Sequence, residues 1–141
     1  MEVVWTGPYG WPEFEGPLPV LPAHGGVYLQ TAEYDGGYLI YCAGHTGRPF
    51  RVRFAEHTKL YMSGDYNVLD MAAMQRGIRQ EVWHGWGWSP EKRAAFAERR
   101  PSILDAVRKQ LTGFRIFVAN VSTEKRVRER IGKCGQQHPR I

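Results

Sequence analysis

Two basic side chains lie one helical turn apart in the stretch RPFRVRFAEHTKLY, residues 48–61. Arg53 and His57 are separated by four positions, so on a helix they share one face and can both point at a single phosphate group. Arginine stays charged at every physiological pH, and its planar guanidinium can bind two phosphate oxygens at once. The spacing therefore favours an anion-binding helix face, and the alternative is a solvated face of an ordinary amphipathic helix.

A β-hairpin is expected just before this helix. Residues 26–32 (GVYLQTA) and 37–43 (GYLIYCA) are rich in β-branched and aromatic residues, which favour strands. The Asp35-Gly36 pair between them is a strong signal for a two-residue turn. Residues 50–62 then repeat apolar side chains close to helical spacing, which predicts a helix that carries both basic side chains.

The remaining pattern predicts short strands and helices in alternation. Caps and breakers mark the helices: Ser89 and Pro90 precede one helical run, and Gly113 and Gly132 follow others. The predicted elements are a short strand and a helical turn within 66–77, a strand at 78–83, helices at 89–100 and 102–111, a strand at 114–121 and a helix at 123–131.

These elements predict one α+β domain, a small α/β sandwich with a mainly antiparallel sheet. The chain has 141 residues, of which 43% are hydrophobic, and this length suits one core and is too short for two. Residues 1–25 hold five prolines and several glycines, so they predict an arm without long regular structure that packs its aromatic side chains on the domain. The domain proper spans residues 26–131, and residues 132–141 are expected to form an irregular tail.

Positive charge is concentrated in the last third of the chain. The formal net charge is +5, with a net −3 over residues 1–89 and a net +8 over residues 90–141. This balance favours an anionic partner, of which nucleic acid is the commonest. No apolar run approaches the roughly 18 residues of a membrane span, and the first residues lack the basic start and apolar core of a signal peptide. We therefore expect a cytoplasmic protein without membrane contact.

The candidate nucleic-acid contacts are basic side chains, most of them on predicted helices. Spread over several helices, they can follow a duplex backbone, which makes binding salt-dependent and largely independent of base sequence. The alternatives are solvated helix faces, or a basic surface that docks an acidic protein. The aromatic cluster VWHGWGWSP either stacks on bases or closes an edge of the core. The candidate contacts are Arg51, Arg93, Arg99, Arg100, Arg108, Lys109 and Arg126.

No zinc motif is visible in the sequence. Cys42 and Cys134 have neither a zinc-ligand spacing nor the pattern of a disulfide framework, so both are expected to be free thiols, with Cys42 buried in a strand. His84 has no second ligand at a metal-binding spacing.

Three motifs stand in a characteristic order within about 32 residues. Gly-Val-Tyr at 26–28 opens the first strand of the hairpin, and residues 39–46 (LIYCAGHT) include its second strand. Arg-Phe-Ala-Glu-His at 53–57 follows on the helix. Together they resemble the GIY-YIG nuclease family, whose Gly-Ile-Tyr, Tyr-Ile-Gly with a following Gly-x-Thr, and Arg-x-x-x-His elements they match.

The resemblance covers residues 26–62 well and residues 113–131 loosely. It implies a mainly antiparallel, three-stranded central sheet flanked by helices, with a helical insertion at about residues 58–112. It also implies an endonuclease that hydrolyses phosphodiester bonds in DNA, which is expected to be double-stranded. The implied cofactor is Mg²⁺, with Mn²⁺ as the other candidate ion.

The same resemblance implies the roles of five residues. Tyr28 is the general base or orients the attacking water, and Tyr41 and His57 belong to its hydrogen-bond network. Because a tyrosine ionises near pH 10, Tyr28 would need its pKa lowered by the metal ion and by Arg53, and activity should rise toward alkaline pH. Arg53 stabilises negative charge on the phosphate. Glu129, on the predicted helix at 123–131, is the metal ligand.

Three departures from the family pattern qualify this reading. Two residues instead of one separate Tyr41 from Gly44, which predicts a β-bulge in the hairpin. Arg53 lies one residue further from Gly44 than the commonest spacing gives. The last predicted helix breaks at Gly132, soon before the sequence ends. The alternative function is therefore a non-catalytic nucleic-acid-binding module of the same fold with an incomplete or truncated active site.

Overall fold

The predicted hairpin forms the centre of the fold in the computed structural model, which describes residues 3–87 and 89–121. Strand β2 (Gly26–Tyr34) pairs with β3 (Gly37–Thr46) in antiparallel register, with Tyr34 opposite Gly37. Asp35 and Gly36 form the turn with φ of 51° and 73°. Two positive φ values are what a two-residue type I′ hairpin turn requires, and Asp-Gly is among the pairs that adopt them readily.

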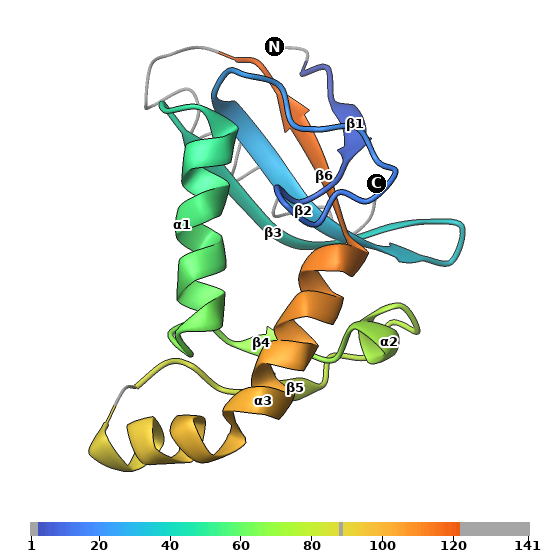
Figure 1. Ribbon diagram of the computed structural model, residues 1–141. Coiled ribbons are helices and arrows are strands. Elements are labelled where there is room, and N and C mark those ends of the chain that lie inside the picture. The colour runs from blue at the N-terminus through green and yellow to red at the C-terminus, as the bar shows by residue number, and fades with distance from the viewer. Residues whose placement is uncertain (1–2, 88, 122–141) are drawn as a thin grey trace.

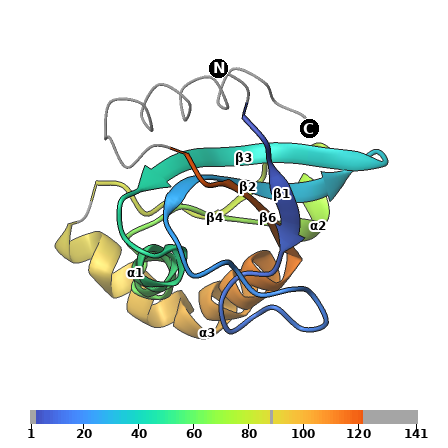
Figure 2. The same ribbon diagram turned by 90° about the horizontal axis from the view of Figure 1, so that it is seen from above.

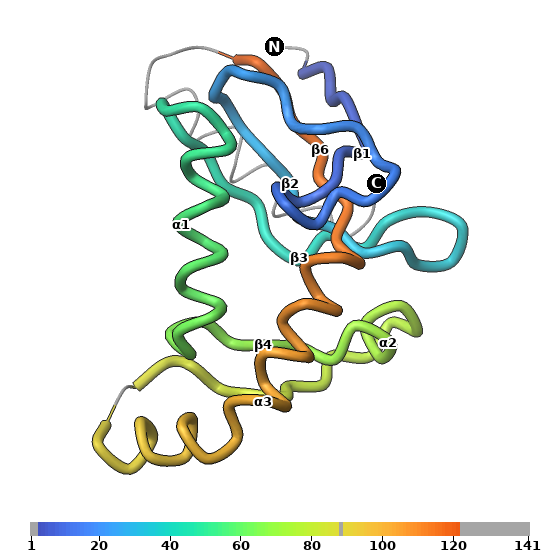
Figure 3. The backbone as a smooth tube through the Cα atoms, viewed as in Figure 1, coloured from blue at the N-terminus to red at the C-terminus, as the bar shows by residue number. Residues whose placement is uncertain are grey.

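The main sheet has four strands in the order β1-β6-β2-β3, all antiparallel (Figure 1). This is one strand more than the three expected, because β1 (Thr6–Tyr9) from the arm pairs with β6 (Phe114–Ala119). Figure 3 follows the arm to this position beside β6. Pro8 lacks an N–H donor, and an edge strand such as β1 is where a sheet accommodates that loss.

Helices α1 (Phe50–Met62) and α3 (Pro90–Gly113) lie on the same face of the sheet (Figure 2). The bounds of α1 are those predicted. Its buried side chains include Phe50, Phe54 and His57, which lie at successive turns and face the sheet. Helix α1 therefore packs with this face against the sheet, and Arg53, one turn before His57, lies near Tyr28 of β2.

Helix α3 is continuous, whereas two helices separated at Pro101 were predicted. Figure 1 shows α3 changing direction between its gold and orange parts, and the helix contains Pro101. A proline inside a helix removes one hydrogen bond and bends the axis without always ending the helix. Here Ile103, Val107 and Leu111 are fully buried on the far side of the bend, and their packing holds the second half of the helix.

A small two-stranded sheet connects α1 with α3. It consists of β4 (Val68–Leu69) and β5 (Glu81–Trp83), with the single turn α2 (Met71–Met74) between them. The strand at 78–83 is shorter than predicted, and the strand and turn expected within 66–77 are present. The backbone N–H of Leu69 donates to the buried Gln110 Oε1 at 2.9 Å, which ties this unit to α3. The assignment of residues 58–112 as an insertion stays a prediction.

The arm belongs to the core. Trp11 has 0% exposure, and its Nε1–H donates to Thr58 Oγ1 at 2.7 Å. Its ring lies 4.7 Å from that of Phe54 and 5.9 Å from that of Tyr61, centroid to centroid. The expected packing of aromatic side chains is therefore confirmed for Trp11, which fills the space between the arm and α1.

The predicted helix at 123–131 and the tail at 132–141 lie outside the described residues. Within residues 3–87 and 89–121, no helix is both long enough and apolar enough to cross a membrane.

Candidate functional site

Four of the five predicted catalytic residues line one pocket of about 550 Å³. Tyr28 comes from β2, Tyr41 from β3, and Arg53 and His57 from α1. The segment between α1 and α3 closes the remaining side. Residues far apart in the sequence thus meet at one concave surface, which is the arrangement that a catalytic or binding site requires.

A β-bulge in β3 brings Tyr41 into this pocket. Gln30 pairs with Cys42 and Thr31 pairs with Ile40, so Tyr41 is the extra residue of the second strand. In a regular strand, consecutive side chains point to opposite faces, but a bulge changes that alternation. Tyr41 and Cys42 consequently both line the pocket. The predicted bulge is confirmed, and it accounts for the additional residue before Gly44.

Gly44 allows Tyr28 to lie against β3. Gly44 is the register partner of Tyr28, and a Cβ atom on it would lie only 2.4 Å from the Tyr28 hydroxyl oxygen. Real Cβ contacts are never this short, so a side chain at position 44 would displace the phenol. The glycine therefore positions the Tyr28 hydroxyl, which points across the strand toward α1.

The Tyr28 hydroxyl is hydrogen-bonded to His57 Nε2 at 2.9 Å, and His57 Nδ1 is hydrogen-bonded to the Tyr66 hydroxyl at 2.9 Å. A neutral imidazole has one N–H donor and one acceptor nitrogen. One tyrosine must therefore donate to the ring while the other accepts from it. The three side chains form a continuous path for a proton from Tyr28 to Tyr66, which is only half buried.

His57 is held neutral by its surroundings. Burial disfavours the charged imidazolium, and the nearby positive charge of Arg53 acts in the same direction, so the pKa of His57 falls from 6.5 to about 4. The Glu56 carboxylate opposes this shift without overcoming it. At neutral pH His57 is therefore a hydrogen-bond relay and carries no charge.

The pKa of Tyr28 moves in the direction opposite to the one expected. Burial raises it to about 12, and Arg53, through hydrogen bonding and charge, offsets only part of that effect. Burial also raises the pKa of Tyr41. Arg53 therefore lowers the Tyr28 pKa as expected, but desolvation is the larger influence, so the lowering that catalysis needs would have to come from a bound metal ion as well.

Arg53 is one of two arginines that line the pocket. Its side chain is 33% exposed, so it can reach a ligand, and one of its Nη atoms lies 3.7 Å from Glu56 Oε1. Glu56 also pairs with Arg48, at 2.5 Å. Burial alone would lower the pKa of Arg53, but its contacts with Tyr28, Tyr66 and Glu56 raise it. Arg53 consequently remains charged and is only loosely engaged by Glu56.

Two buried polar atoms of the pocket residues lack a hydrogen-bond partner among the described residues. They are Gln30 Oε1 and His45 Nδ1. A buried polar atom that makes no hydrogen bond is costly, typically by about 1–3 kcal/mol. Gln30 lies two positions after Tyr28 and shares its face of the sheet, so Gln30 Oε1 is the atom available to a ligand or ordered water in the pocket, whereas His45 pairs with Val27 on the opposite face.

Sequence reasoning missed several of the pocket residues. Gln30 could have been found, because it lies two positions after Tyr28 and therefore on the same face of β2. Tyr66, Arg79 and Trp86 also line the pocket. Tyr66 and Arg79 have no local spacing that signals a site, because the fold of the segment between α1 and α3 brings them there, whereas Trp86 belongs to the aromatic cluster for which base stacking was one expectation.

The predicted nucleic-acid contacts lie elsewhere. None of the six that are described lines the pocket. Arg51 lines a separate hollow with Ala55 and Thr58, on another side of α1 from Arg53. Arg99 donates to the Val82 carbonyl at 2.7 Å and so ties α3 to β5. Lys109 pairs with Asp105 at 3.0 Å. Three more of the candidates are exposed on α3: Arg93, Arg100 and Arg108. Arg126 lies outside the described residues.

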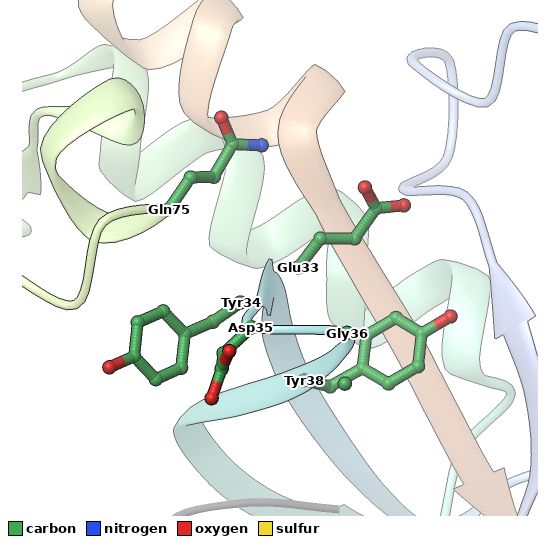
Figure 4. A pocket seen from close by; sticks show the side chains of 7 residues that line it. Glu33, Tyr34, Asp35, Gly36, Tyr38 and Gln75 are labelled. Carbon is green, nitrogen blue, oxygen red and sulfur yellow. The ribbon is translucent and has the colours of Figure 1, made fainter.

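A second hollow, of about 410 Å³, surrounds the β2–β3 turn (Figure 4). The rings of Tyr34 and Tyr38 point to opposite sides of the turn, and Gln75 approaches from the end of α2. The carboxylate of Glu33 already pairs with Arg115 at 3.2 Å. None of the four predicted catalytic residues that the structure describes lines this hollow, so it is separate from the pocket that holds them.

The described part of the pocket does not by itself fit a magnesium ion. Its lining includes neither aspartate nor glutamate, and no group of three His, Cys, Asp or Glu side chains among the described residues could hold a metal. Mg²⁺ binds proteins chiefly through carboxylate oxygens. Glu129, the predicted ligand, lies outside the described residues.

Comparison of the chain with protein-family models, with curated proteins and with solved structures finds no match.

Proposed function

We propose that this chain is a cytoplasmic, GIY-YIG-type endonuclease that hydrolyses phosphodiester bonds in DNA with the help of Mg²⁺ or Mn²⁺. The observation that carries the proposal is the convergence of Tyr28, Tyr41, Arg53 and His57 on one pocket. These are the residues that the sequence motifs select, and they come from two strands and a helix. The order β6-β2-β3 within the sheet, with α1 after the hairpin, supports it further.

Arg53 binds the scissile phosphate in this proposal. It is the charged, partly exposed group next to Tyr28, and an arginine stabilises the negative charge that accumulates on phosphate oxygens during hydrolysis. Gln30 Oε1, which is buried without a hydrogen-bond partner among the described residues, supplies a further polar contact. Most of the catalytic effect then comes from positioning and electrostatics.

Tyr28, His57 and Tyr66 move the proton of the attacking water. In the tautomer with hydrogen on Nδ1, His57 accepts from Tyr28 at Nε2 and donates to Tyr66. As the water oxygen attacks phosphorus, the P–O bond to the leaving sugar oxygen breaks and that oxygen takes a proton from solvent, while the water proton passes to the Tyr28 oxygen and the Tyr28 proton passes to Nε2. The Nδ1–H bond to Tyr66 then helps to stabilise the resulting imidazolium.

This relay operates only when the substrate is bound. Because burial raises the pKa of Tyr28 to about 12 and lowers that of His57 to about 4, proton transfer from Tyr28 to His57 is strongly unfavourable in the free protein. A phosphate bound to Arg53 brings negative charge beside His57 and counteracts the repulsion from the guanidinium. The pKa of His57 then rises, and the transfer becomes easier. Activity should still increase toward alkaline pH, because Tyr28 is a weak acid.

The metal ion is assigned to Glu129. Glu129 would hold the Mg²⁺ ion, and the ion would supply positive charge at the phosphate and lower the pKa of a bound water. None of the steps above depends on its position.

A second candidate function is a non-catalytic nucleic-acid-binding module. The observation in its favour is that the described pocket lining lacks a carboxylate. In that case Arg53 and the polar atoms of the pocket bind phosphate without hydrolysing it, and the proton relay has no role.

The test is nicking and linearisation of supercoiled plasmid with Mg²⁺, with Mn²⁺ and with EDTA. Cleavage should need the metal ion and should be abolished in Arg53→Ala. Lys59→Ala, which removes an exposed cation from the same helix outside the pocket, should cleave like the wild type. Glu129→Gln should lose cleavage while keeping duplex affinity. Absence of wild-type cleavage with either metal, together with retained DNA binding, would support the second candidate.

Tyr66→Phe tests the relay. The substitution keeps the ring and removes only the hydroxyl that bonds His57 Nδ1. We expect turnover to fall roughly 10- to 100-fold with DNA affinity unchanged, because the partner that orients His57 and stabilises its charge is lost. The pH–rate profile should also shift. Unchanged turnover and an unchanged profile would remove Tyr66 from the mechanism.

A further inference from the structure

Trp86 presents a large apolar surface to solvent at the candidate site. Its exposure is 64%, and it lines the same pocket as Arg53 and Tyr66. An indole left in water forgoes the stabilisation that its burial would give. An exposed tryptophan beside polar and cationic groups is therefore a candidate contact for a flat ligand.

Hydrogen bonds hold the loop that carries this side chain. The Gly85 N–H donates to Asn67 Oδ1 at 2.8 Å, and the Lys92 ammonium donates to the Trp86 carbonyl. A few residues earlier, Trp83 Nε1–H donates to the Gly64 carbonyl at 2.9 Å. The backbone at positions 85 and 86 is thus anchored, so the segment that carries the exposed ring loses less conformational freedom when it binds a ligand.

Close packing of the backbone also anchors the loop that carries Trp86. A Cβ atom on Gly85 would lie 2.5 Å from the carbonyl carbon of Tyr66, so the two backbone segments are in direct contact there. The Trp86 loop therefore rests on the residue that ends the Tyr28–His57–Tyr66 path.

The tryptophans of this segment have separate roles. Trp83 is 5% exposed, and its ring packs against Phe96 at a centroid distance of 5.5 Å, so it closes the edge of the core. Trp86 makes no comparable contribution to the core. The two readings of the aromatic cluster, core closure and base stacking, thus apply to different residues.

The charges around Trp86 select an anionic ligand. Arg53 and Arg79 line the pocket, and its described lining has no carboxylate. Arg79 pairs with Glu81 at 3.5 Å but keeps 59% of its side chain exposed. A ligand that combines phosphate charge with a flat ring matches both the arginines and the indole, and a nucleotide is such a ligand.

We propose that Trp86 stacks on an unpaired nucleobase next to the phosphate that Arg53 binds. This rests on the proposed function, and it refines the substrate. A base within a continuous duplex is already stacked on both faces and cannot also lie on an indole. The preferred substrate therefore contains an unpaired nucleotide at the site, as in a single strand, a flap or a junction, and this differs from the fully double-stranded DNA expected from the sequence.

The test measures binding of a labelled, single-stranded oligothymidylate in EDTA by fluorescence anisotropy. Trp86→Ala should raise the Kd by roughly 5- to 150-fold, and Trp86→Phe should raise it less, because phenylalanine also stacks. Val20→Ala, which shortens an apolar side chain that is 59% exposed and lies outside the pocket, should leave the Kd unchanged. Thermal melting establishes that each variant is folded.

A second measurement uses the wild-type protein and does not depend on any variant folding. One abasic nucleotide is moved along the oligonucleotide. We expect a loss of affinity at one position, and Trp86→Ala should be insensitive to that change. A folded Trp86→Ala protein that binds like the wild type, or an abasic scan without a sensitive position, overturns the nucleobase site. Metal-dependent cleavage that requires Arg53 would still uphold the proposed function in that case, whereas a wild-type protein that binds no nucleic acid overturns both.

Discussion

His57 illustrates at the residue scale how burial changes what a side chain can do. The sequence pairs it with Arg53 as two basic groups that face one phosphate. In the structure only Arg53 is a cation at neutral pH, because burial keeps His57 uncharged and places its ring between the hydroxyls of Tyr28 and Tyr66. The pair thus combines one charge with one proton relay.

The stability of the protein should therefore fall in mild acid. The pKa of His57 is about 4 in the folded state and 6.5 in the unfolded state, so the unfolded state takes up the proton first as the pH drops. The stabilisation is complete above pH 6.5 and decreases as the pH falls toward 4, by about 3 kcal/mol in total.

Urea unfolding at a series of pH values measures this decrease. His57→Gln should have a smaller decrease over the same range, because glutamine does not titrate. His84→Gln, which replaces an exposed histidine outside the pocket, should follow the wild type. Equal pH dependence in His57→Gln and wild type would contradict the assignment of this effect to His57.

At the scale of elements, the bulge in β3 and the glycine at position 44 arrange the site together. The bulge places both Tyr41 and Cys42 on the pocket face, and Gly44 leaves room for the Tyr28 phenol against the same strand. A regular strand with a larger residue at position 44 would turn Tyr41 away and push Tyr28 out.

Gly44→Ala should therefore lower both stability and activity. The new Cβ would meet the Tyr28 hydroxyl at 2.4 Å, and overpacking of this kind costs about 1–3 kcal/mol. Chemical denaturation and plasmid cleavage measure the two effects. In a Tyr28→Leu background the same substitution should cost much less, because the shorter side chain leaves the space free. Additive losses in the double variant would mean that the effect comes from the strand and not from Tyr28.

At the scale of the whole molecule, the arm and α3 show how distant segments complete the domain. Trp11 from the arm fills the core next to α1, and β1 pairs with β6 near the other end of the described chain. The arginines of α3 divide into two sets. Arg99 supports Val82 and Trp83, whereas Arg100 and Arg108 are exposed and can contact a nucleic-acid backbone.

Replacing Arg100 and Arg108 by glutamine should weaken binding to unrelated DNA sequences by similar factors. Each lost phosphate contact should reduce the slope of log K against log salt concentration by about 0.9 for duplex DNA. Anisotropy titrations at several salt concentrations test this. Arg76→Gln, which removes an exposed positive charge after α2, is the matched control. An unchanged slope in the double variant would exclude this face of α3 from the interface.

The sequence by itself determined the elements that depend on local interactions. The Asp35-Gly36 turn, the hairpin and the bounds of α1 follow from turn chemistry and from the spacing of apolar residues. The resemblance of the motifs to a known family implied that Tyr28, Tyr41, Arg53 and His57 share a site, and the additional residue before Gly44 predicted the bulge.

Only the tertiary structure decided the features that depend on contacts between distant segments. The fourth strand, the continuity of α3 across Pro101, and the positions of Tyr66 and Trp86 all arise from packing that no local pattern encodes. The tertiary structure also decided the direction in which the Tyr28 pKa shifts. It depends on the competition between burial and the charge of Arg53, and the extent of burial is known only when the surrounding elements are in place.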